Sequence, residues 1–348
     1  MNKAQAAGAA LAVFAAFGAA AQKQTIKIAS VAPNRSPWDV EQRKLAQEWA
    51  RISGGDAMLQ FFDTQAIGSE NGVIQKLRGA RPGQRAPLDG AVFTCIGIHE
   101  LAPEAHILTL CVPFTFKTQA EVDYVLEAVS GDIQKAVQNK GYVLLGCFGV
   151  GWIYFSTKEP VRTPEKLKDL RLAMGGFGSP EFTAALKTAG YKVENIPLDK
   201  ISQNIRSPGG VQGVYAIPMY TYATKYHETL RYVLDLPICP VFTAFIMSEP
   251  VWDSFSAPYR AQLLEAVKKS ERVFSSMQQE TDEHYLALME QSGVTRAVPT
   301  AAELAAWEKS FTEDAQKMLD GNNTILDRAF YRRILALLAE YRKQNGGG

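Results

Sequence analysis

Hydrophobic and polar positions follow two different periods along this chain. Residues 25–31 (TIKIASV) alternate and are rich in β-branched side chains, which predicts a strand. Residues 39–52 then repeat apolar side chains at helical spacing, with Val40, Leu45 and Trp49 on the predicted buried side. Residues 142–148 (YVLLGCF) form a continuous apolar run, typical of a central strand buried on both faces. The recurrence of strands and helices predicts an α/β protein.

The stretch from residue 149 to residue 178 reads as strand, loop, short helix and strand. Its aromatic run at 152–155 is β-prone, and Thr163 with Pro164 forms a helix start, Thr as N-cap and Pro at the first helical position. Residues 170–174 (LRLAM) predict the next strand. Later in the chain, residues 258–292 predict one long amphipathic helix, and residues 301–344 a last helical block.

Composition narrows the class of protein. The chain has 348 residues, enough for two lobes with cores of their own. Its 47% hydrophobic and 21% charged residues fit an ordinary soluble globular protein. The net charge of +1 and the lack of a basic run interleaved with aromatics argue against a nucleic-acid partner.

The N-terminal segment has the pattern of a secretory signal peptide. A weakly basic start at Lys3 precedes an Ala-rich apolar run, and small residues before Gln22 provide a cleavage site near Ala21. A membrane anchor is the alternative, but the run is short for one. We therefore expect export to the periplasm, with residues 1–21 removed.

The sequence offers no pattern typical of catalysis, of a metal site or of a cofactor. None of His99, His106, His227 and His284 has a metal or triad spacing, and a solvated loop is the simpler interpretation of Glu100 between the first two. Nucleophile-elbow, Walker and Rossmann motifs are missing from the sequence. The four cysteines, Cys95, Cys111, Cys147 and Cys239, lie in apolar surroundings and are interpreted as buried free thiols, although export permits a disulfide.

Several segments together carry a resemblance to a known family. Residues 160–172 (PVRTPEKLKDLRL) resemble a "P-I-R-T-P-E-D-L-K-G-L-K-I" pattern, and residues 209–218 (GGVQGVYAIP) resemble "G-x-V-D-G-x-E-N-x-P". Residues 67–70 (IGSE) are similar to its "L-G-S-x-x-E" turn. These motifs belong to DctP-type solute-binding subunits of tripartite ATP-independent periplasmic (TRAP) transporters. The resemblance covers roughly residues 26–292.

The resemblance implies a two-lobed, type II-like periplasmic binding fold with crossing hinge strands and a long spine helix. We expect the first lobe to hold residues 22–148 and 235–257, and the second to hold 149–234 with parts of 258–348. The hinge strands are expected near residues 148–154 and 230–236, and the spine helix at 258–292, spanning both lobes.

The candidate ligand site departs from the family pattern. The Arg that clamps an organic-acid carboxylate in the family falls on Ala173 here, and the other polar clamp positions fall on or near Trp152, Tyr215, Ala216 and Ile217. A buried carboxylate without a cation costs several kcal/mol, which disfavours a dicarboxylate ligand. The predicted ligand-binding residues are Trp38, Glu70, Phe93, Thr94, Trp152, Tyr154, Ala173, Met174, Tyr215, Ala216, Ile217, Met219 and Tyr220. A polar head group would be left with Glu70, Thr94 or Arg171.

The sequence thus predicts an exported solute-binding protein that captures an apolar or amphipathic small molecule for a TRAP permease, with no enzymatic activity. Two alternatives stay open. In one, the aromatic residues fill the cleft and the protein is a relay component without a small ligand. In the other, it is an exported α/β hydrolase. Some family members that lack the arginine clamp are paired with tetratricopeptide-repeat periplasmic proteins, so the resemblance implies such a protein as a further partner.

Overall fold

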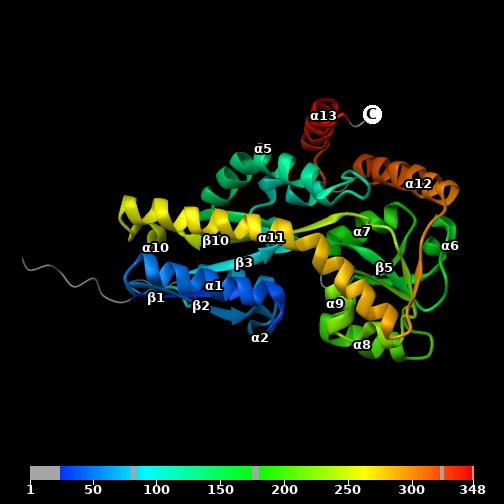
Figure 1. Cartoon of the computed structure of the whole chain (residues 1–348), viewed down its shortest axis with the longest axis horizontal. Coiled ribbons are helices and arrows are strands. Elements are labelled where there is room, and N and C mark those ends of the chain that lie inside the picture. The colour runs from blue at the N-terminus through cyan, green and yellow to red at the C-terminus, as the bar shows by residue number, and fades with distance from the viewer. Residues whose placement is uncertain (1–23, 80–83, 175–179, 322–324, 347–348) are drawn as a thin grey trace, which may run out of the picture.

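The computed structural model describes residues 24–79, 84–174, 180–321 and 325–346. The predicted signal peptide lies outside these residues. The described chain forms two α/β lobes side by side, each built around its own sheet, with the helix α11 running along both (Figure 1). This confirms the predicted fold class.

The first lobe is built on a five-stranded sheet in the order β2-β1-β3-β10-β4. Its strands are β1 (Gln24–Ser30), β2 (Ala57–Asp63), β3 (Gly90–Thr94), β4 (Tyr142–Trp152) and β10 (Pro240–Ser248). Strands β1, β2 and β3 pair in parallel, whereas β10 runs antiparallel to β3 and β4. Strand β4 stays in this sheet to Trp152, beyond the predicted lobe boundary at residue 148.

The second lobe is built on a six-stranded sheet in the order β11-β9-β5-β8-β6-β7. Its strands are β5 (Tyr154–Thr157), β6 (Arg171–Met174), β7 (Lys192–Glu194), β8 (Gly213–Ala216), β9 (Tyr232–Leu234) and β11 (Thr295–Ala297). Strands β6, β7 and β8 pair in parallel, so their carboxyl ends meet at one edge of the sheet.

Short helices cover both sheets. Those of the first lobe are α1 (Pro37–Ile52), α2 (Thr64–Ile67), α3 (Glu70–Arg78), α4 (Cys95–Leu101), η1 (Pro103–Ala105), η2 (Ile107–Cys111), α5 (Gln119–Gln138) and α10 (Glu249–Asp253). Those of the second are α6 (Pro164–Asp169), α7 (Pro180–Thr188), α8 (Leu198–Arg206), α9 (Pro218–Ala223) and η3 (Tyr226–Glu228). Helix α6 begins as its sequence predicts, because the Thr163 side chain accepts a hydrogen bond from the Lys166 N–H.

The segment that joins β4 to β5 and the segment that joins β9 to β10 both cross between the lobes, and they are bonded to each other. Ile153, between β4 and β5, donates its N–H to the Cys239 carbonyl at 2.9 Å and accepts from the Ile238 N–H at 2.9 Å. The return crossing between β9 and β10 therefore lies beside the outgoing one. Two adjacent crossings give a hinge that can change a few backbone dihedrals without breaking either sheet.

The spine helix α11 (Ala257–Gln291) packs on α1 and β4 in the first lobe and on α9 and β11 in the second. Its acidic side chains bind the free edge of β4: Glu271 accepts from the Cys147 N–H and Asp282 from the Trp152 N–H, both at 2.8 Å. Gly151 fits here because its φ is +140° and an added Cβ would come within 3.0 Å of Asp282. Burial raises the pKa of Asp282 to about 8.

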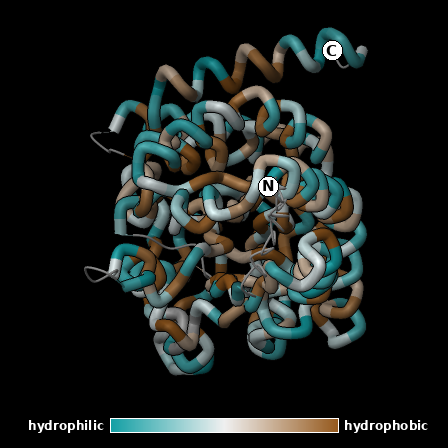
Figure 2. The backbone as a smooth tube through the Cα atoms, turned by 90° about the vertical axis from the view of Figure 1, so that its left-hand side faces the viewer, coloured by the Kyte–Doolittle hydropathy of each residue, from teal (hydrophilic) through white to brown (hydrophobic). Residues whose placement is uncertain are grey.

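The predicted helical block at 301–344 is two helices. Helix α12 (Ala301–Asp320) packs on α6 and α7 of the second lobe, and α13 (Arg328–Gln344) returns to the first lobe against α5. In Figure 2, α13 crosses the top of the molecule with hydrophilic and hydrophobic residues alternating along it. Its apolar face meets α5 because Phe330, Ile334 and Leu338 recur at helical spacing and are buried.

Most buried apolar side chains belong to one cluster that continues from the first lobe through the crossings into the second. A smaller cluster, with Ala173, Ile201 and Val214 among its members, lies in the second lobe around β6, α8 and β8. None of the helices in the described part of the chain is long and apolar enough to cross a membrane.

Candidate ligand-binding site

A cavity of about 290 Å³ lies between the two lobes. Its wall from the first lobe includes Val31, Thr64 and Thr94, which follow or end strands β1, β2 and β3. Its wall from the second lobe includes Met174, Asn195 and Ile217, which end or follow strands β6, β7 and β8. The carboxyl ends of parallel strands from both lobes thus face one space, the usual ligand position in open α/β sheets.

Glu70, at the start of α3, carries the carboxyl group of the inner wall. Its Oε1 accepts a hydrogen bond from the Thr94 N–H at 2.6 Å, and its Oε2 bonds the Thr94 hydroxyl at 2.8 Å. Burial, with a smaller contribution from the negative charge of Glu100, raises the pKa of Glu70 to about 7. Glu70 is therefore poised to change protonation near neutral pH.

A tight turn brings Glu70 to the cavity. Gly68 and Ser69 both have positive φ angles, +101° and +108°. Ser69 lies outside the left-handed helical region that polar residues sometimes occupy, so its backbone is strained. Ser69 lines the cavity as well, which places this strain at the site itself.

The polar wall of the first lobe holds further groups. Thr64 is 1% exposed, and its hydroxyl oxygen has no hydrogen-bond partner within the described residues. Gln42 reaches the cavity from α1 and accepts from the Ser30 hydroxyl at 2.8 Å. Glu100, at the end of α4, is exposed at the rim, where partial burial and the negative charge of Glu181 raise its pKa.

Apolar and aromatic side chains supply much of the remaining wall. They come from both lobes and from the spine helix: Trp38, Val92, Ile96, Met174, Ile217, Tyr220 and Phe274. Trp38 and Tyr220 are large π-systems that enter from opposite lobes, from α1 and α9. A small molecule held here would contact hydrophobic surface on both sides.

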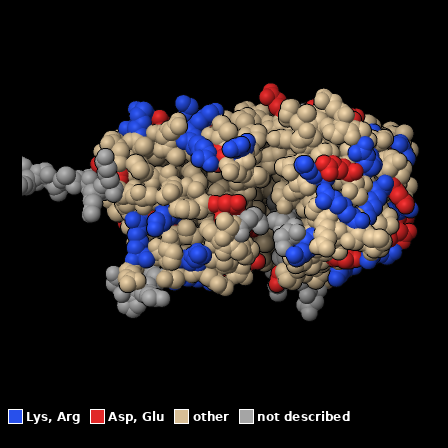
Figure 3. Space-filling view, turned by 90° about the horizontal axis from the view of Figure 1, so that it is seen from below, with Lys and Arg blue, Asp and Glu red and all other residues tan. Residues whose placement is uncertain are grey.

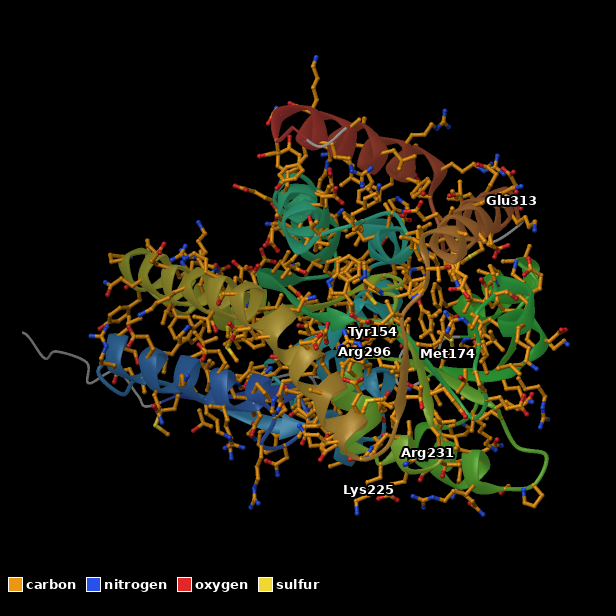
Figure 4. The ribbon with its side chains drawn as sticks, turned by 45° about the vertical axis from the view of Figure 1, so that its right-hand side comes forward. Tyr154, Met174, Lys225, Arg231, Arg296 and Glu313 are labelled. Atoms are coloured by element: carbon orange, nitrogen blue, oxygen red, sulfur yellow. The ribbon has the colours of Figure 1, made fainter. Side chains whose placement is uncertain are left out.

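No lysine, arginine or histidine is found among the described residues that line the cavity. Basic side chains of the second lobe lie elsewhere. Arg171 donates to the Gly210 carbonyl at 2.8 Å, and Arg296 pairs with Asp235 at 2.8 Å. Figure 4 shows Arg296 beside Tyr154, and Lys225 and Arg231 toward the outer side of the lobe.

The structure brings part of the predicted site together. The cavity wall contains Trp38, Glu70, Thr94, Met174, Ile217 and Tyr220. The other predicted residues do not line it: Phe93, Trp152, Tyr154, Ala173, Tyr215, Ala216 and Met219. All of the latter are buried in the protein interior.

Strand geometry explains the placement of Ala173. Successive side chains of a strand point to opposite faces, so Met174 reaches the cavity and Ala173 packs in the smaller cluster with Ile201. The position that the family pattern assigns to a clamping arginine is thus core in this chain.

Trp152 and Tyr154 belong to the crossing, and the Tyr215 hydroxyl lies 2.8 Å from the Cys239 sulfur.

Sequence reasoning missed several lining residues. Thr64 and Asn195 directly follow strands, so the carboxyl-end rule would have found them. The sequence predicts a solvated loop at Glu100, whereas this residue lies in the last turn of helix α4 at the cavity rim. Gln42 and Phe274 carry no sequence signal, because only the packing of α1 and α11 turns them inward.

The cysteines are free thiols in this structure. Cys95, Cys111 and Cys239 are buried and Cys147 is partly buried. The sulfur atoms of Cys95 and Cys111 lie 3.7 Å apart, and burial raises the pKa of Cys239 to about 12. Within the described residues, no group of three or more His, Cys, Asp or Glu side chains could hold a metal ion.

Residues 28–322 match the DctP family, described as bacterial extracellular solute-binding protein, family 7. A solute-binding protein of Roseobacter denitrificans is 19% identical over 289 residues, covering 82% of this chain and 84% of the relative. The fold is similar to that of a TRAP periplasmic solute-binding protein from Ochrobactrum anthropi whose C-terminus is bound in its ligand-binding pocket. The two structures have a TM-score of 0.78 and 17% sequence identity, and the match covers 93% of this chain and 97% of the Ochrobactrum chain. The fold is also similar to that of one from Sulfitobacter with bound β-D-galacturonate, with a TM-score of 0.75, 18% identity and coverage of 91% and 100%.

The chain belongs to the DctP family, and it is a TRAP-type solute-binding protein. This family serves transport, which confirms the prediction that the protein is not an enzyme. TRAP solute-binding proteins bind small molecules and deliver them to a membrane permease.

Proposed function

We propose that this protein captures a small, largely apolar solute without a carboxylate and delivers it to a TRAP permease. The observation that carries the proposal is the cavity wall, in which aromatic and aliphatic side chains lie with Glu70, Glu100 lies at the exposed rim, and none of the described lining residues is a lysine, arginine or histidine. An anionic ligand would meet like charge and lose its hydration without compensation. Galacturonate, bound in the Sulfitobacter protein, is such an anion.

The cavity also bears on the alternative of a relay protein with a filled cleft. A space of about 290 Å³ between the lobes would accommodate a small organic molecule. The crossings bonded at Ile153 would let the lobes close on it, and closure would follow from a ligand that binds the closed state more tightly. A hydrolase is not supported, since the family is one of transport proteins.

The test is native mass spectrometry of the purified mature protein, followed by organic extraction of whatever it carries. We expect an apolar or amphipathic molecule that is lost in Met174→Arg, which places an unpaired cation in the cavity. Ile196→Val, a conservative change in the same wall, serves as the control. A co-purifying organic acid would contradict the proposal, and a protein that binds no small molecule would favour the relay role.

Export and partners complete the proposal. We propose that the segment before Gln22 is cleaved near Ala21 and that the mature protein acts in the periplasm, with a tetratricopeptide-repeat protein as a second partner beside the permease. N-terminal sequencing of the periplasmic protein, and affinity capture from a periplasmic extract, test these points. Recovery of neither a permease subunit nor a helical-repeat protein would contradict the partner assignment.

A further inference from the structure

We propose that the cavity selects a solute with a positively charged nitrogen head group, an organic ammonium, held between Glu70 and the aromatic wall. This inference rests on the proposed function, because it assumes that the cavity takes a small solute. The inference goes further in specifying that the solute carries a positive charge. The geometry of the acidic groups, the unpartnered hydroxyl of Thr64 and the aromatic rings point to it independently.

The acidic groups form a series from the cavity to the surface. Glu70 lies in the wall, Glu100 lies at the rim on the same lobe, and Glu181 begins α7 on the opposite lobe. The negative charge of Glu100 raises the pKa of Glu70, and that of Glu181 raises the pKa of Glu100. Neighbouring carboxylates in this series therefore repel each other. Figure 3 shows acidic side chains of the first lobe beside the hollow between the lobes. A cation entering here would relieve repulsion that the protein leaves uncompensated.

The hydrogen bonds of Glu70 leave room for such a cation. Thr94 supplies one donor to each carboxylate oxygen and the Gly97 backbone N–H adds a third, whereas an ionised carboxylate offers about four lone-pair positions. The Thr64 hydroxyl lines the same cavity, is buried and lacks a partner among the described residues, so it can accept an N–H. A buried polar atom of this kind requires a partner, which a bound ammonium would provide.

The aromatic residues favour the same ligand. Trp38 and Tyr220 line the cavity with Glu70, and the faces of such rings attract organic cations. Carboxylate and π-face together hold an ammonium by its charge, while the surrounding Met174 and Ile217 contact its hydrocarbon part. A neutral solute would use only the second of these interactions.

The experiment is isothermal titration calorimetry of the mature protein at about pH 8, above the pKa of Glu70. The probes share one phenylalkyl skeleton: phenethylammonium, phenethyl alcohol and hydrocinnamate. We expect phenethylammonium to bind about tenfold more tightly than the alcohol, and hydrocinnamate more weakly than both. Glu70→Gln should reduce the preference for the ammonium over the alcohol to about twofold or less.

Controls separate the charge from the fold. Glu308→Gln removes one carboxylate from an exposed position of α12 and should leave all three affinities unchanged. Glu100→Gln, at the exposed rim, should lower ammonium affinity about threefold without affecting the fold, and covers the case in which Glu70→Gln does not fold. Equal affinity for ammonium and alcohol overturns this inference but leaves the proposed function standing. Tightest binding of hydrocinnamate, or binding of none of the probes, overturns both.

Discussion

Two carboxyl groups in this protein, those of Asp314 and Glu70, differ in the partners that the fold provides for them. Asp314, on α12, has a side chain that is 2% exposed, and it pairs with Lys168 at 2.7 Å and accepts from the Tyr191 hydroxyl at 3.0 Å. Glu70, in the cavity wall, accepts from Thr94 and from the Gly97 backbone, has no cationic partner among the described residues, and has a second acid, Glu100, nearby. The first group is compensated by a cation within the fold, whereas the second has no cationic partner among the described residues, as our proposal of a bound ammonium requires.

The difference follows from what each region must do. Asp314 fastens α12 to the second lobe, so any uncompensated charge there would reduce stability. Glu70 lies in the cavity between the lobes, and in the proposed site a permanent cation would occupy the place of the ligand. A binding site is therefore a region where an electrostatic deficit is tolerated, at a cost in stability carried by the rest of the fold.

The largest effect should come from removing the cation at Asp314. Lys168→Met leaves a buried carboxylate without its main partner, so we expect the free energy of unfolding to fall by about 3 kcal/mol. Urea unfolding followed by circular dichroism measures it. Lys192→Met breaks an exposed pair with Asp169 on the same lobe and should cost about 0.5 kcal/mol or less. Equal effects of the two variants would show that Asp314 does not depend on Lys168.

A second effect is the pH dependence that Glu70 imposes on stability. The folded-state pKa is raised from 4.5 to about 7, so the protonated carboxyl favours the folded state. Its stabilising contribution is complete below about pH 4.5 and is lost as the pH rises through about 7. The free energy of unfolding should fall by at most about 3 kcal/mol over this range. Asp282, whose pKa is raised to about 8, adds to the same fall.

Thermal unfolding of the ligand-free protein across this pH range measures the dependence. Glu70→Gln should flatten the fall in melting temperature between about pH 4.5 and 7, while the contribution of Asp282 persists toward pH 8. Glu308→Gln should behave as the unmodified protein. A stability that rises over this interval in the unmodified protein, with Glu70→Gln no flatter, would contradict the assignment.

A smaller effect is expected from filling the space beside Glu70. A Cβ at Gly97 would come to 2.5 Å from Glu70 Oε1 and 2.6 Å from Phe93 Cδ1, so Gly97→Ala must displace the carboxyl group. We expect a loss of about 2 kcal/mol in stability and weaker ligand binding. Gly131→Ala, in α5 with nothing within 4 Å of the added Cβ, should stabilise by up to about 1 kcal/mol. If Gly97→Ala bound the ligand with unchanged affinity, Glu70 would not contribute to ligand binding.

The smallest effect should come from the exposed end of α13. Arg342 pairs with Glu121 of α5 at 2.7 Å, with the arginine side chain 31% exposed. The Glu121 side chain is 5% exposed, but without Arg342 it still accepts from the Lys117 N–H at 2.6 Å, and the partly exposed arginine site admits water, so Arg342→Ala should lower stability by only about 1 kcal/mol. Hydrogen exchange should increase in α13 and leave the cavity strands unchanged. Faster exchange in β6 or β8 would show that α13 supports the second lobe.

Much of the fold could be predicted because its signals are local. The alternation in 25–31 gave β1, and Thr163 with Pro164 gave the start of α6. Helical spacing predicts the buried face of a helix less well where that helix lines a cavity. It assigned Val40 to the buried side of α1, yet Val40 is 46% exposed and Gln42 is buried at the cavity. A polar residue can take a core position when it faces a ligand space, which periodicity does not reveal.

The sequence by itself determined the fold class, the spine helix and the family, because strand and helix patterns and the motif at 160–172 depend on near neighbours in the chain. It also supplied the acidic and aromatic residues of the site. Only the tertiary structure decided that Met174 rather than Ala173 faces the cavity, and that Glu70, Thr64 and Tyr220 line the same cavity. The physical reason is that the face of a strand follows from its register in the sheet, and a cavity between lobes from contacts far apart in sequence.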